Sequence, residues 1–116
     1  EVKALFAALG KVFVLPSALM GVGGAITGCG PAFVDLMIEA FADAGVYYGL
    51  PRDKALAMVS ATIEGSAKLQ KETGTHPGVL KDMVCSPGGS TIRGVVALED
   101  AGFRAACISA IHAIMK

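Results

Sequence analysis

The sequence has no tryptophan, few charged residues and no net charge, and these absences narrow its class. Ten basic and ten acidic residues balance over 116 positions, so no basic field points to nucleic acid and no acidic field to a cationic partner. Charged residues make up 17% of the chain, below the roughly 25% of an ordinary soluble domain. So few charges cover a lone domain poorly, and we expect the surplus apolar surface to lie in a subunit interface or against another domain.

Cysteine is also scarce. Cys29, Cys85 and Cys107 form no C-x-x-C pair, and an odd number excludes complete pairing in internal disulfides. His76 and His112 lie far from them in sequence, so we expect no metal site. We interpret the three as reduced cysteines of a cytoplasmic protein.

A long run without charge, residues 12–34, is long enough for a membrane span. It contains two prolines and five glycines, which a lone helix in lipid tolerates poorly, and no signal-peptide pattern precedes it. We therefore predict that this run is the buried start of a helix and that it does not insert into a membrane. The alternative, a membrane anchor, would require detergent for extraction.

The first fifteen residues differ from the rest. Their pattern predicts a short helix, Val2 to Leu9, and an apolar strand, Val12 to Leu15. A single strand has no sheet to join here, so we interpret residues 1–15 as the tail of a preceding α/β domain. Residues 16–116 form the second domain, which begins at Pro16-Ser17.

That second domain is predicted to be all-α. The first expected helix starts at Ser17 and runs toward Gly21 or beyond. Five more are expected at residues 31–48, 51–73, 77–85, 90–101 and 103–115, with glycine or proline at most borders. The helix at 51–73 would span about 33 Å, and its uncharged middle needs cover that so small a domain lacks. The sequence therefore predicts a helical bundle that interlocks with a second copy.

One loop, Ser86 to Thr91 (SPGGST), has the composition of a ligand-binding turn. Its glycines allow a tight turn and close approach of a ligand, and Ser90 and Thr91 begin a helix whose free N–H groups and dipole attract a carboxylate or phosphate. A plain helix–helix turn with an N-cap explains the same residues equally well. No lysine follows the glycines, so this is not a P-loop, and no β-α-β unit with a Rossmann fingerprint is present.

Several ordered segments match the sequence motifs of one enzyme family. Thr27 to Phe33 (TGCGPAF) is similar to an S-G-S-G-P-A-Y motif, and in this it resembles the pyrroline-5-carboxylate reductase family. The other matching segments, correctly spaced over residues 25–104, are Asp43 to Val46, Gly49 to Arg52, His76 to Asp82, Ser86 to Thr91 and Gly102 to Arg104.

The resemblance implies a two-domain enzyme that reduces 1-pyrroline-5-carboxylate to L-proline. An N-terminal Rossmann domain would hold NADPH or NADH, and this helical domain would form a homodimer, with larger rings left open. By the same resemblance, Ser86, Gly88, Gly89, Ser90 and Thr91 would bind the substrate carboxylate. Thr91 would also be the catalytic residue, its hydroxyl near the ring nitrogen. Met83 would approach the cofactor, although a methionine on an apolar helix more often serves packing.

The sequence departs from the family pattern in one region, at Ser17, Gly21 to Gly24, Cys29 and Phe33. Two alternatives therefore stay open: a reductase of a related cyclic imine, and a helical dimerisation module without catalysis. Kinetics of the full-length protein with pyrroline-5-carboxylate would separate them.

Overall fold

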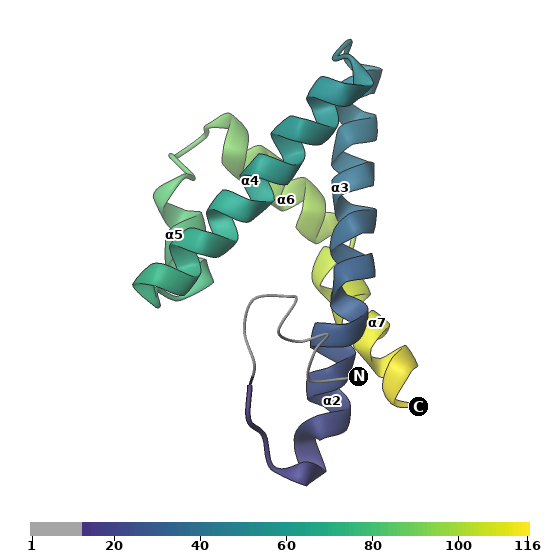
Figure 1. Ribbon diagram of the computed structural model, residues 1–116. Helices are drawn as coiled ribbons and strands as arrows, with labels where there is room; N and C mark the ends of the chain where they lie inside the picture. The colour runs from purple at the N-terminus through teal and green to yellow at the C-terminus, as the bar shows by residue number, and fades with distance from the viewer. Residues whose placement is uncertain (1–12) are drawn as a thin grey trace. The chain divides into compact units, whose positions relative to one another are not determined.

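The computed structural model describes residues 13–116, and every regular element within this range is helical. The all-α prediction is therefore confirmed for this range. The predicted helix Val2 to Leu9 lies outside the described residues. In chain order the elements are η1 (Ser17–Leu19), α2 (Met20–Gly24), η2 (Ala25–Cys29), α3 (Gly30–Tyr47), α4 (Arg52–Thr73), α5 (Pro77–Met83), α6 (Ser90–Asp100) and α7 (Phe103–Met115) (Figure 1).

The chain divides into two compact units, and the border between them falls inside α3. The described part of the first unit contains residues 13–36 and 104–116, and the second unit contains residues 37–103.

The first unit begins with an irregular segment. Residues 13–16 have no regular structure, so the strand predicted to end at Leu15 is wrong over its described part; Val12 lies outside it. A strand needs a neighbouring strand to satisfy its backbone N–H and C=O groups, and residues 13–116 contain no other strand. Instead, the Leu15 side chain packs on the backbone of Gly23, where it occupies the place of a Cβ.

A single long helix follows, from Ser17 to Tyr47. The sequence predicted a new helix starting at Pro31, which is wrong. The chain passes from a 3-10 turn into α2, then through the π-helical stretch η2 into α3 without a break (Figure 1). A proline inside an α-helix lacks its N–H and clashes with the carbonyl four residues earlier, here Thr27; the wider π turns just before Pro31 accommodate this.

The same unit brings α2 against the end of α7. A side chain added at Gly21 would meet the Met115 Cε atom at 3.5 Å. Gly21 therefore allows two helices distant in sequence to approach each other, and α7 has the bounds predicted from the sequence.

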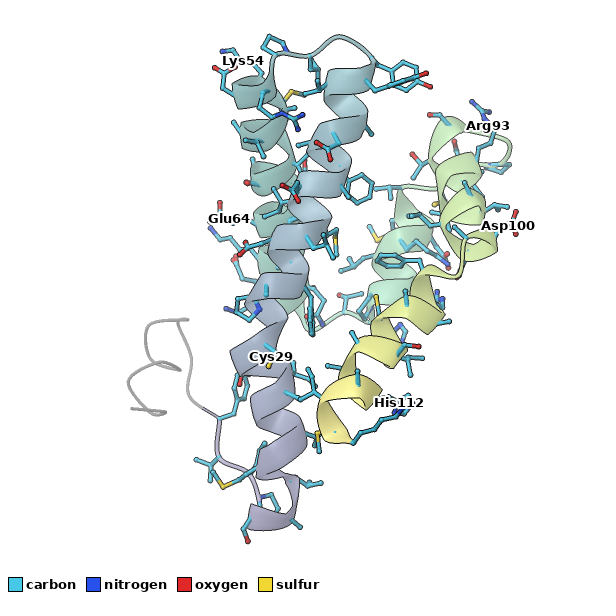
Figure 2. All side chains as sticks on the ribbon, turned by 90° about the vertical axis from the view of Figure 1, so that its right-hand side faces the viewer. Cys29, Lys54, Glu64, Arg93, Asp100 and His112 are labelled. Carbon is cyan, nitrogen blue, oxygen red and sulfur yellow. The ribbon has the colours of Figure 1, made fainter. Side chains whose placement is uncertain are left out.

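The second unit is built on the C-terminal part of α3 and on α4, two helices that meet at the short turn that joins them (Figures 1 and 2). Small residues form the contact: Ala42 and Ala55 are buried, and a Cβ at Gly45 would meet the Ala55 Cβ at 3.4 Å. The turn between the helices is closed by the Leu50 amide, which donates to the Gly45 carbonyl at 3.0 Å.

Capping residues define the remaining helices. Gly49 (φ 106°), Gly74 (φ 65°) and Gly102 (φ 79°) take left-handed conformations at the predicted stops, as glycine does most readily. At the start of α5, His76 Nδ1 accepts a hydrogen bond from the Gly78 amide at 2.9 Å and so caps the helix. That helix ends at Met83, two residues before the predicted Cys85.

The described residues bury very little apolar surface. Only Ala25, Ala42 and Ala55 are buried, and no large side chain is. Exposed large apolar residues occur on every long helix, among them Leu36, Met58, Leu69, Val96 and Ile108. One helix, Ser17–Tyr47, is long and apolar enough to cross a membrane by length and composition. An apolar surface of this extent favours cover from outside residues 13–116.

Candidate anion site at the start of α6

The loop Ser86 to Gly89 forms a tight turn between α5 and α6. The Gly89 amide donates to the Ser86 carbonyl at 3.1 Å, and Gly88 has φ 70°. Proline at the first central position and a positive φ at the second are the signature of a type II turn. The sequence folds this way because Pro87 fixes φ, while Gly88 takes a φ that costs other residues about 1–2 kcal/mol.

Gly89 has no room for a side chain. A Cβ at this position would lie 2.6 Å from the Ser86 Oγ and 3.3 Å from the Ser86 carbonyl oxygen. The Gly89 amide already donates to the Ser86 carbonyl, so it is not a free donor for a ligand in this geometry. What Gly89 contributes is a bare backbone beside the Ser86 hydroxyl.

Helix α6 starts directly after this turn with free donors. Within the described chain, the amides of Ser90, Thr91 and Ile92 have no acceptor; the first bond of the helix is from the Arg93 amide to the Gly89 carbonyl, at 3.4 Å. Ser90 and Thr91 are exposed to solvent, and no side chain caps the helix. Three unpaired N–H groups at the positive end of a helix dipole, beside two hydroxyls, form a suitable site for a carboxylate.

A residue that sequence reasoning missed adds to this arrangement. The Arg93 Nη1 atom donates to the Gly88 carbonyl oxygen at 2.9 Å. Figure 2 shows Arg93 at the end of α6 that joins the loop, with Asp100 toward the other end. Arginine three residues after a helix start carries no motif signal, and the contact depends on the turn geometry.

Met83 lies at the end of α5, a few residues before the turn, and is 75% exposed. It is therefore open to a ligand and is not used in packing within the described chain. An exposed, polarisable thioether suits contact with a flat ring.

A separate apolar hollow of about 320 Å³ lies within the α3–α4 pair. Only Thr62 carries a polar side chain among its lining residues, which are Phe41, Gly45, Leu50, Ala55, Met58, Val59, Thr62 and Ile63. It contains no acid, base or nucleophile, so it suits apolar side chains of another chain and not a reaction.

Comparison with known proteins places this turn and the start of α6 in a family. Residues 17–116 match the family described as pyrroline-5-carboxylate reductase dimerisation. The chain belongs to this family. The pyrroline-5-carboxylate reductase of Treponema pallidum is 49% identical over 113 residues, 97% of this chain and 43% of that protein. The Synechocystis enzyme is 50% identical over 116 residues, all of this chain and 43% of that protein.

Solved structures of pyrroline-5-carboxylate reductases share the fold. A Plasmodium falciparum pyrroline carboxylate reductase with NADP bound has a TM-score of 0.88 and 37% identity, and the match covers 97% of this chain and 45% of that one. The Streptococcus pyogenes enzyme has a TM-score of 0.88 and 38% identity, over 97% of this chain and 44% of that one. The chain thus spans less than half the length of the reductases it matches.

Proposed function

We propose that the full-length protein carrying this chain reduces 1-pyrroline-5-carboxylate to L-proline with NAD(P)H. This chain would provide the dimerising, carboxylate-binding part. The observation that carries the proposal is the set of free amides on Ser90, Thr91 and Ile92, directly after the S-P-G-G turn, in a member of this reductase family.

In this proposal the α6 start holds the substrate. The carboxylate accepts hydrogen bonds from the Ser90 and Thr91 amides, and the bare backbone at Gly88 and Gly89 lets it approach closely, beside the Ser86 hydroxyl. Bound NAD(P)H supplies the hydride to the imine carbon. The Thr91 hydroxyl donates a hydrogen bond at the ring nitrogen, where a proton must arrive as the imine becomes an amine. Met83 offers an exposed apolar surface to the cofactor.

We also propose that the partner of this chain is a second copy of itself. The dimerisation family, the absence of any buried large side chain in residues 13–116, and the apolar hollow between α3 and α4 all support this proposal. The apolar helix Ser17–Tyr47 is then covered by protein and not by lipid, in keeping with a cytoplasmic enzyme. Assembly of dimers into larger rings stays a prediction.

The remaining part of the enzyme lies outside the helical domain in this proposal. Residues 1–15 are the tail of an N-terminal Rossmann domain that binds the dinucleotide. In support, the family match starts at residue 17, and the matched reductases are more than twice as long as this chain. Reading the coding sequence upstream of Glu1 tests this: a β-α-β unit with a glycine fingerprint is the expected result.

The deciding experiment measures turnover of the full-length protein with pyrroline-5-carboxylate and either NADPH or NADH. The expected result is proline formation that falls about ten- to a hundred-fold in Thr91→Ala, from loss of roughly 1–3 kcal/mol of hydrogen bonding. Turnover of only another cyclic imine would redirect the assignment to that substrate. No turnover of any imine by a folded dimer would leave dimerisation alone as its role.

A further inference from the structure

A side-chain hydrogen bond from Arg93 joins the first turn of α6 to the turn Ser86 to Gly89. Gly88 is the residue with positive φ in the turn, and its carbonyl oxygen accepts from the Arg93 Nη1 at 2.9 Å. The Arg93 amide also donates to the neighbouring Gly89 carbonyl, at 3.4 Å. The first turn of α6 is therefore held to the S-P-G-G turn from both the side chain and the main chain of one residue.

The guanidinium has no competing partner. Among the described residues, no carboxylate lies within ion-pair distance of Arg93, and its one hydrogen bond is the one to Gly88. The group is exposed, so this bond adds little to the stability of the fold. Its placement points to a local task, at the residue that directly follows the three free amides.

The task follows from electrostatics. A carboxylate that approaches the free amides of α6 is repelled by any backbone carbonyl that turns toward it. A hydrogen bond to the Gly88 carbonyl oxygen fixes the direction of that carbonyl dipole and offsets its partial negative charge. The planar guanidinium suits this because it donates along a fixed direction.

We propose that Arg93 is a positioning residue of the carboxylate site: it fixes the Gly88 carbonyl and so preserves the orientation of the Ser90 and Thr91 amides. This rests on the proposed function. Loss of the guanidinium weakens binding of the substrate equally in its ground and transition states. It therefore raises KM for the imine acid and leaves kcat unchanged.

The test compares Arg93→Ala, Arg93→Lys and the control Lys81→Ala in the full-length protein. Lys81 is a cation on α5 that pairs with Asp82 at 3.5 Å and has no contact with the turn in the described chain. We expect KM for pyrroline-5-carboxylate to rise about three- to ten-fold in Arg93→Ala, with kcat within twofold, and to recover only in part in Arg93→Lys, which keeps the charge but not the planar guanidinium. Lys81→Ala should match the parent.

Two further readings separate positioning from simple charge attraction. The KM ratio should persist in 0.5 M KCl, because a hydrogen bond to a carbonyl is not screened as a long-range charge is. Amide exchange in peptides covering residues 86–93 should also accelerate in Arg93→Ala, since Arg93 no longer holds the Gly88–Gly89 peptide group, whose N–H donates to the Ser86 carbonyl. A ratio that collapses in salt, an unchanged KM or unchanged exchange would each overturn the proposal.

The exchange measurement also keeps this inference distinct from the proposed function. If the parent protein fails to reduce pyrroline-5-carboxylate, the substrate assignment fails and with it the KM effect. If the parent protein is fully active but amide exchange in Arg93→Ala is unchanged, only the positioning role of Arg93 is refuted.

Discussion

Met58 on α4 offers a direct test of how this chain covers its apolar surface. Its side chain is 56% exposed and lines the hollow between α3 and α4. If a second copy fills that hollow, shortening Met58 to alanine removes contact area from the interface. It leaves the buried small-residue contact at Ala42 and Ala55 intact.

The size of the effect follows from the exposed fraction. Full burial of a methionine side chain is worth about 1.5–3 kcal/mol, so covering the exposed half contributes about 1–1.5 kcal/mol in each copy. A two-fold dimer carries the change on both sides. Met58→Ala should therefore cost about 2–3 kcal/mol of association free energy, which is about 30- to 150-fold in the dimer Kd.

Fluorescence-detected sedimentation of the full-length protein, over a dilution series, measures this Kd. Lys68→Ala is a matched control, since it shortens an exposed polar side chain on the same helix and should leave the Kd unchanged. Met58→Glu should weaken the dimer further, because it would place an unpaired charge in the interface. A parent-like Kd for both Met58 variants would show that the partner does not cover this face.

Three other predictions concern the candidate site and the turn between α3 and α4. Thr91→Val should lower kcat/KM for pyrroline-5-carboxylate about ten- to a hundred-fold while Thr91→Ser stays within about threefold, because only the hydroxyl is lost in the first; equal rates in a steady-state assay would contradict the assigned role. Gly89→Ala should raise KM, since its Cβ would lie 2.6 Å from the Ser86 Oγ. Adding Ser86→Ala should lower KM again in part; no recovery would show that the clash with the Ser86 carbonyl, and not with its hydroxyl, causes the loss. Asp43→Ala should lower the free energy of unfolding in urea by less than about 1 kcal/mol, because its ion pair with Arg52 is exposed on both sides; a larger loss would mean that the pair is covered in the assembled protein.

Helix borders were predictable wherever glycine or proline determines the backbone locally. Gly49, Gly74 and Gly102 stop helices in the structure as their positions in the sequence indicate. Helix α7 has its expected extent, and α4 begins at Arg52, one residue after the predicted Pro51. Residues 13–116 bury no large side chain, and the low charge content and the uncharged middle of α4 predict such a surplus of exposed apolar surface.

Prediction failed where a neighbour or a rare helix type decides the structure. Phe13 to Leu15 have a strand-like composition, but a strand requires a partner, and the local pattern says nothing about whether one exists. The glycines and Pro31 predict a helix break if every turn is α-helical, whereas a π stretch accommodates them. The Arg93 contact depends on the path of the turn, which the sequence order does not encode.

The π-helical stretch Ala25–Cys29 also sets the phase of the helix that contains it. Successive residues of an α-helix are rotated by about 100°, and a π turn holds an additional residue. Residues after the stretch therefore point in directions that an uninterrupted α-helix would give to their neighbours. Deleting one residue from it would therefore allow a plain α-helix in which both ends keep the side-chain directions they have now. Pro31 opposes such a deletion, because a plain α-turn at that point would return its ring to the carbonyl of the preceding turn.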